Sequence, residues 1–348
     1  MPSPTPDNSP PPPGASLAAW LRRWLVWLLL GSYVLAALVP APGTWLTGLR
    51  SGEGVSFSLV MVGVLLLTGA MAVNVGKLRE LPRHPVALLT ALAGVWGPPV
   101  VVVALWSILA PACLPGPLAA SLGAGMAFAG AMPVANSAVA WTHQSGGSLA
   151  WALGLVVLSI CLCPWVTPLV LGLMGQTLAG ASAAEADLLV SRFSGAVFVV
   201  WVLVPTLLGL GLHAALGGRR VEKLAPRLTI ASAAALLLLN YANAATALPN
   251  VLAEPDWRLL GTTLVAAVTL PVAGAAVAWP LSLLGRVSRR GRVAWAYSLG
   301  MKNTGLALGL VGATLGDQPV AILVILAVTL MQHVVAGAVH AIAARSEG

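Results

Sequence analysis

The stretch Gly300–Leu310, GMKNTGLALGL, contains the features that decide the fold of this chain. It lies inside an apolar segment, Val293–Leu315, that is long enough to cross a bilayer, yet it carries Lys302. A lysine in mid-membrane costs about 2.5–3.5 kcal/mol on insertion scales, and glycine lowers the cost of leaving the helix. We therefore expect an interrupted membrane helix that holds a cation at membrane depth.

The whole chain is as apolar as this segment. Of its 348 residues, 58% are hydrophobic and 8% are charged, and the mean hydropathy is +0.92. An ordinary soluble domain carries roughly a quarter charged residues, so a soluble chain of this composition could not cover its own surface. The composition predicts an all-α integral membrane protein. The three cysteines lie in apolar surroundings and predict neither a disulfide framework nor a metal site, and no cofactor is expected.

Ten apolar segments of spanning length follow one another along the chain. They are 17–38, 56–75, 85–109, 118–141, 149–174, 193–216, 228–248, 259–284, 293–315 and 319–343.

The loops between these segments alternate in charge. On one side of the membrane the basic residues are Arg50, Arg192 and Arg258, and the remaining loop lysines and arginines lie on the other side. The positive-inside rule then places both termini in the cytoplasm, with a multi-pass chain in the cell membrane. The net charge of +8 follows from this orientation and does not indicate a nucleic-acid partner. All ten acidic residues fall in loops or tails, which leaves Lys302 as the formal charge at membrane depth.

The domain organisation follows from the same pattern. Residues 1–16 are Pro-rich and predict a disordered cytoplasmic tail, and residues 17–345 form a single transmembrane domain. Five spans fall in each half, about 17–175 and 185–345. An odd number of spans per half makes the second half enter from the opposite side, so that the halves form inverted repeats, as in many carriers.

Each half is interrupted in its fourth span. The first interruption is Pro133 in AGAMPVANSAVAW, and the second is marked by Gly300 and Gly305. Both also carry an amide, Asn136 and Asn303. Unwound backbone is tolerated in a membrane where it is buried or lines a cavity, so a ligand site is expected here. The alternative is a simple packing kink, because glycine and proline are common in membrane helices.

Several segments resemble the bile acid/sodium symporter family, which shares its architecture with arsenite efflux carriers. The resemblance covers most of the chain and is clearest in VNVGKLRELPRHPVAL after the second span, in Pro133–Pro168 and in GMKNTGLALGL. It implies a panel of spans 1, 2, 6 and 7, and a core of spans 3–5 and 8–10 in which broken spans 4 and 9 cross. Span 4 has no cysteine, which argues against arsenite as substrate.

The residues that differ from the family lie at its sodium site. In an ungapped alignment, the sodium-binding glutamate becomes Ser298 and the neighbouring glutamine becomes Lys302. The Ser-Asn pair of span 4 and the hydroxyl ligands of span 5 also become aliphatic, at Ala138, Val139, Ala152 and Val156. A shifted alignment would place Ala135 and Asn136 on the Ser-Asn pair, but it needs a two-residue insertion. The resemblance thus implies a sodium site whose ligands are replaced.

The resemblance also implies a set of substrate-binding residues around the breaks. Asn136 falls on a hydroxyl position near the substrate, Asn303 matches the family asparagine, and His333 falls on a histidine of span 10. The expected substrate-binding set is Asn136, Ser137, Lys302, Asn303, Thr304 and His333. A lone histidine on an apolar helix is also compatible with a core role.

Lys302 admits two interpretations. It lies about ten residues beyond Arg292, or roughly 15 Å at helical rise, which is too deep for easy snorkelling to an interface. In the preferred interpretation it is a tethered cation in place of sodium that faces an anionic group. With Ser298 it would then occupy the coupling position, either as a permanent charge or as a proton carrier.

These observations favour one function and leave an alternative from another class. The first hypothesis is a secondary transporter of a small organic anion, independent of sodium, with proton coupling open. The alternative is a membrane sensor or scaffold that kept the fold. No phosphate loop, metalloprotease motif or dinucleotide motif is present, so an enzyme is not expected. The expected partners are an anionic small molecule and the bilayer, and the oligomeric state is left open.

Overall fold

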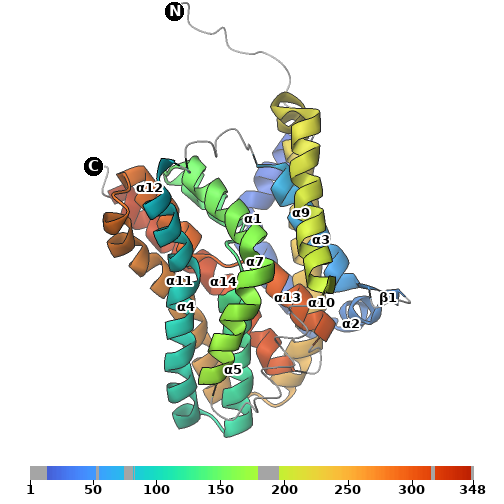
Figure 1. Cartoon of the computed structure of the whole chain (residues 1–348). Helices are drawn as coiled ribbons and strands as arrows, with labels where there is room; N and C mark the ends of the chain where they lie inside the picture. Colours follow the sequence, from blue (N-terminus) through green and yellow to red (C-terminus); the bar gives the residue numbers. More distant parts are fainter. Residues whose placement is uncertain are drawn as a thin grey trace, which may run out of the picture.

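The computed structural model describes residues 14–51, 55–73, 81, 83–178, 196–314 and 318–345. In this part the chain is almost entirely helical and its helices run up and down in one bundle (Figure 1). The helices are α1 (Ala15–Leu38), α2 (Ala41–Gly48), α3 (Phe57–Met71), α4 (Pro85–Cys113), α5 (Gly116–Ala131), α6 (Ser137–Gln144), α7 (Leu149–Thr177), α9 (Ala196–Leu216), α10 (Gly218–Ala253), α11 (Trp257–Leu284), α12 (Arg289–Gly300), α13 (Thr304–Thr314) and α14 (Pro319–Arg345). Strands β1 (Arg50–Ser51) and β2 (Val55–Ser56) form a small hairpin. The Pro-rich tail expected at residues 1–16 lies outside the described residues up to residue 13.

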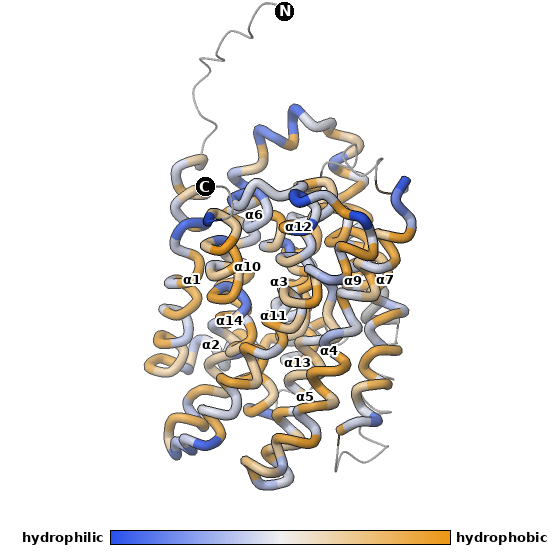
Figure 2. The backbone as a smooth tube through the Cα atoms, turned by 90° about the vertical axis from the view of Figure 1, so that its left-hand side faces the viewer, coloured by the Kyte–Doolittle hydropathy of each residue, from blue (hydrophilic) through white to orange (hydrophobic). Residues whose placement is uncertain are grey.

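Six of the described helices are long and apolar enough to cross a membrane: α1, α4, α7, α10, α11 and α14. Helix α3 and the Val200–Leu216 part of α9 are apolar but shorter. Hydrophobic (orange) residues fill the middle of the bundle, and hydrophilic (blue) residues gather toward its ends (Figure 2). This is the pattern of a multi-pass integral membrane protein, as the composition predicts.

The helix bounds differ from the expected spans where a helix continues past its apolar part. Helix α10 begins at Gly218, ten residues before the expected start, because its first turns, GRRVEKLAPR, are polar and hydropathy detects only the apolar section. Helix α2 and the β1–β2 hairpin were not predicted. They are short connecting elements held by local backbone bonds, and they leave no hydropathy signal.

Two groups of helices can be distinguished by their contacts. In the panel group, α1 packs on α10, α10 on α3 and α3 on α9. In the core group, α4, α5, α7, α11, α12 and α14 pack on one another, and α6 packs on α7, α12 and α14. Helix α13 follows the core helix α12, but it also packs on α3 and α10 of the panel group. The two groups therefore meet along α13, along α14, which contacts α10, and where α7 contacts α9.

Glycine allows the closest of these contacts. A Cβ on Gly274 of α11 would overlap the carbonyl of Leu299 in α12, and one on Gly125 of α5 would lie 2.8 Å from the carbonyl of Ala321 in α14. Lipid removes most of the hydrophobic drive for helix association, so close van der Waals packing at small residues carries it instead. These contacts fix α12 and α14, which carry the candidate site.

Candidate functional site at the crossing of two broken helices

Both expected interruptions are present in the structure. Helix α5 ends at Ala131 and α6 begins at Ser137, with Pro133 between them. Helix α12 ends at Gly300 and α13 begins at Thr304. The unwound segments are residues 132–136 and 301–303. Gly305 therefore lies inside α13 and not in the break, where its missing side chain leaves room for Leu65 of α3.

The two unwound segments cross each other and exchange backbone hydrogen bonds. The amide of Ala135 donates to the carbonyl of Met301 at 3.0 Å, and that of Asn303 donates to the carbonyl of Pro133 at 2.8 Å. Val134 and Lys302 face each other as an isolated antiparallel bridge. The prediction that these segments approach each other is confirmed by these bonds. They satisfy backbone groups that lipid could not, which is why both helices can break at the same depth.

The bridged pair is held by side chains from two other helices. The amide of Val134 donates to Ser159 Oγ of α7 at 3.0 Å, and the amide of Lys302 donates to Gln332 Oε1 of α14 at 2.9 Å. All four residues are buried. Sequence reasoning missed both acceptors. The available signal was a polar residue in the span that directly follows each broken span.

The Lys302 side chain is 3% exposed, and its ammonium donates to the carbonyl of Val95 in α4. In a regular helix that carbonyl would accept from the amide of residue 99, but residue 99 is proline and has no N–H. Lys302 therefore supplies the donor that Pro99 removes. The ammonium is directed to a neighbouring helix at membrane depth, so the snorkelling alternative is not what the structure shows.

The charged side chain at the crossing is positive. The N-terminal ends of α6 and α13 meet there with the C-terminal ends of α5 and α12, so the helix dipoles offset one another and the charge of Lys302 remains. Acidic side chains in the described part of the chain are Glu222, Glu254 and Asp256, and all three lie near helix ends far from the crossing in sequence. A ligand at this crossing would meet positive charge without a carboxylate to balance it, which favours an anion.

The polar residues of the second break have structural partners. Asn303 Oδ1 accepts from the amide of Leu306 at 3.1 Å and so caps α13. Thr304 Oγ1 accepts from Gln332 Nε2 at 3.4 Å. Ser298 is fully buried one turn before Lys302, and its Oγ has no hydrogen-bond partner. The structure thus brings Lys302, Asn303 and Thr304 together, with Ser298 on the helix that leads to them.

The polar residues of the first break lie at the border between the two groups. Asn136 is half-buried and precedes α6, and a Cβ on Gly69 of the panel helix α3 would overlap its amide group. Ser137 is the first residue of α6 and is half-buried. Because Gly69 lacks a side chain, the Asn136 amide can lie against the panel group. Asn136 thus lies at the contact between the panel and core groups.

His333 lies beside Gln332 in sequence but does not join its hydrogen bonds. Its Nδ1 bonds the carbonyl of Thr329 at 2.8 Å, and its Nε2 is buried without a partner. The same helix, α14, is joined to the panel nearby, because the hydroxyl of Tyr33 in α1 donates to the carbonyl of Leu326 at 3.3 Å. An unpaired buried nitrogen is costly, so His333 Nε2 is a candidate for a bond to substrate or water.

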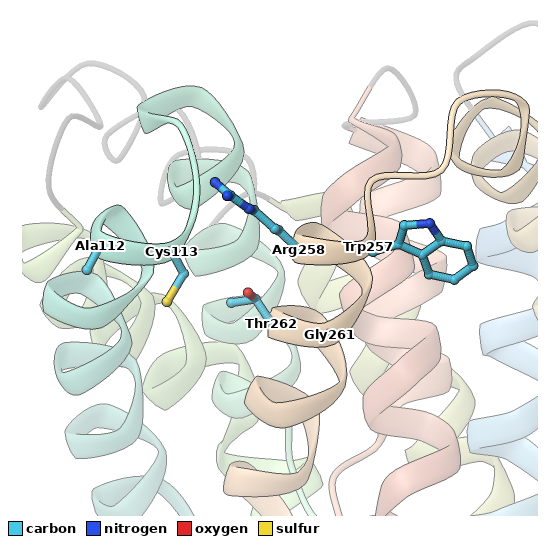
Figure 3. Close-up of a pocket in the computed structure, with 6 residues that line it drawn as sticks. All are labelled: Ala112, Cys113, Trp257, Arg258, Gly261 and Thr262. Carbon is cyan, nitrogen blue, oxygen red and sulfur yellow. The ribbon is translucent and has the colours of Figure 1, made fainter.

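A hollow of about 540 Å³ lies elsewhere, between the ends of α4 and α11. Figure 3 shows Arg258 reaching toward the end of α4 beside Cys113 and Thr262, with Trp257 pointing away. Ala112 is 17 residues along α4 from Val95, roughly 25 Å at helical rise. The hollow is shallow and distant from the crossing, and we assign it no part in the site.

Two broken helices that cross in a membrane bundle are accompanied by a family match over nearly the whole sequence. Residues 23–346 match the model of the SBF-like CPA transporter family. The chain belongs to that family. The resemblance to bile acid/sodium symporters is confirmed at this level, and the SBF-like chain is a membrane transporter and not an enzyme. No curated protein matches the sequence. Within the described residues no group of three or more His, Cys, Asp or Glu could hold a metal ion.

Proposed function

We propose that this transporter carries a small organic anion across the cell membrane by alternating access, without sodium. The observation that carries the proposal is the buried ammonium of Lys302 at the crossing, whereas the carboxylates of the described residues, Glu222, Glu254 and Asp256, lie near helix ends. The ammonium is a fixed cation that serves in place of a bound one. It reaches α4 and not a cleft, so it acts on the substrate through its field and by holding α12 and α13 in place.

Sodium would be disfavoured at such a site for two physical reasons. Sodium needs several oxygen ligands, and this chain places Ser298 and aliphatic residues where the related symporters have a glutamate and hydroxyls. An ammonium about 4 Å away would also repel sodium by roughly 4 kcal/mol at an effective dielectric near 20. That is roughly a thousandfold in affinity, since 1.4 kcal/mol is tenfold.

Ten spans in two inverted repeats fit the described helices. The six long helices, the two shorter ones and the broken pairs α5–α6 and α12–α13 would each cross once. The matched bonds from Val134 to Ser159 and from Lys302 to Gln332 support a two-fold relation between the halves. With both termini in the cytoplasm, α13 then lies in the outer half of the membrane and α6 in the inner half.

The same orientation places contacts between panel and core at both ends of the bundle. Gly309 and Gly312 bring α13 against α3 and α10, where Cβ atoms on them would overlap Val62 and Asn243. Helix α6, its counterpart, packs mainly on core helices, but its Val139 also belongs to a hydrophobic cluster with Val73 and Leu210 of the panel side. Transport would have to separate α13 from the panel at the outer end at one stage of the cycle.

Uptake in proteoliposomes tests the proposal. Sodium is replaced by choline at several pH values, in wild type and in Lys302→Gln. We expect uptake of an organic anion that does not change with sodium. Strong sodium dependence of the wild type would contradict the proposal, and the absence of any flux would favour a sensor or scaffold.

The pH series then distinguishes the possible roles of Lys302. Uptake that depends on pH in the wild type, and loses this dependence in Lys302→Gln, indicates proton coupling. Uptake indifferent to both ions indicates a facilitator with Lys302 as a structural tether. Substrates for this assay are found by a thermal-shift screen of small organic anions with purified protein.

A further inference from the structure

The connection between α11 and α12 carries four arginines within seven residues: Arg286, Arg289, Arg290 and Arg292. Arg286 has a left-handed backbone, with φ of 50°, which is uncommon for a residue other than glycine. Ser288 caps α12 by accepting from the amide of Gly291 at 3.3 Å, so the positive end of that helix lies at the same place. The positive-inside rule explains the sign of this cluster but not its arrangement.

The arrangement joins the positive charge to a lipid-facing surface. The guanidinium carbon of Arg292 lies 4.7 Å from the ring centroid of Trp279 in α11, and Arg292 Nε is buried without a partner. Trp279 is 61% exposed, and Leu283, one turn further along the same face, is 58% exposed. An exposed aromatic ring and an exposed leucine thus lie on the helix face that Arg292 contacts, next to the arginine-rich connection.

We propose that this surface binds an anionic phospholipid of the adjacent leaflet. The headgroup phosphate pairs with Arg286, Arg290 and Arg292, and an acyl chain lies along Trp279 and Leu283. Guanidinium groups bind phosphate through paired N–H donors, and tryptophan is favoured at the level of lipid headgroups. The amphipathic surface selects a phospholipid over free phosphate, which has no part that would cover Trp279.

The site would act on the crossing through α12. Lys302 follows Arg292 by ten residues, across α12 and the break that ends it. A headgroup that holds the start of α12 would restrict the movement of this inner half-helix. Binding of the phospholipid would be the same whichever substrate is carried.

Native mass spectrometry of the full chain tests the proposal. Phosphatidylglycerol and phosphatidylcholine with identical acyl chains are titrated separately into purified protein. We expect the wild type to retain phosphatidylglycerol at least tenfold more tightly. In Arg286→Gln/Arg290→Gln this preference should fall about tenfold or disappear, so that the two lipids are retained about equally, because each arginine at a lipid surface contributes to attraction of the headgroup.

Two further variants separate this site from general attraction to charge. Arg219→Gln/Arg220→Gln removes the same charge from the exposed start of α10 and should keep the preference. Trp279→Ala keeps all charge and should weaken retention of both lipids at least threefold. Equal retention of the two lipids by wild type, or equal loss in the α10 control, would overturn the proposal. Competition by millimolar inorganic phosphate as effective as that by the lipid would also overturn it.

Discussion

The contact between Lys302 and α4 leads to a double-mutant prediction. In Lys302→Met the carbonyl of Val95 loses its donor, and Pro99 offers no amide to replace it. A buried polar group left unpaired costs about 1–3 kcal/mol. Removal of a buried charge has the opposite sign, at about 2.5–3.5 kcal/mol on insertion scales. The change in unfolding free energy caused by Lys302→Met alone can therefore have either sign, because the two contributions are of similar size. The interaction energy between Lys302→Met and Pro99→Ala has a sign that follows from the hydrogen bond alone.

Pro99→Ala supplies the missing amide. In the Lys302→Met background Val95 regains a helical donor, whereas in the wild-type background its carbonyl already has one. We therefore expect Pro99→Ala to stabilise the protein by about 1–2 kcal/mol more in the Lys302→Met background. Effects of the proline on the unfolded chain are the same in both backgrounds and cancel in the cycle.

The assay is reversible unfolding in mixed micelles with increasing dodecyl sulfate, followed by tryptophan fluorescence. Pro98→Ala is the matched control, because its new amide would reach the carbonyl of Gly94, one residue away from the lysine's acceptor. Pro98→Ala should change the unfolding free energy by the same amount in the wild-type and Lys302→Met backgrounds. If Pro99→Ala is additive with Lys302→Met within about 0.5 kcal/mol, or if Pro98→Ala couples as strongly, the proposed replacement of the amide by the ammonium is wrong.

Three further predictions concern other contacts of the site. Gln332→Leu leaves the backbone amide of Lys302 without its acceptor and should destabilise the protein by about 1–3 kcal/mol in the same unfolding assay. Val334→Leu, on the exposed face of α14, should change the unfolding free energy little. Gly309→Leu should overlap the panel helix α3 and reduce uptake in proteoliposomes at least tenfold, whereas Gly261→Leu, which faces open space, should leave uptake unchanged. Equal uptake by both variants would mean that the contact of α13 with α3 is not needed for transport. His333→Gln should raise KM several-fold with little change in unfolding free energy, and an unchanged KM would leave the histidine as a core residue.

The sequence by itself determined the membrane class, the positions of the apolar segments and the two interruptions. Hydropathy depends on local composition, so the expected spans end near the observed helices, as with Leu149–Thr177 and Trp257–Leu284. Pro133 and Gly300 marked the breaks because proline and glycine alter the backbone wherever they stand. Lys302 was conspicuous because a charge in lipid is costly in any fold.

Only the tertiary structure decided what each residue of the site contacts. Nothing near Lys302 in the sequence indicates that its ammonium reaches Val95, because the acceptor is exposed by a proline 203 positions earlier. Gln332 and Ser159 likewise became significant when α14 and α7 placed them beside the crossing. Gly305, taken from the sequence as part of a break, instead makes room for another helix. Hydrogen bonds between distant segments depend on packing at ångström distances, and this packing is a property of the folded bundle that no local pattern carries.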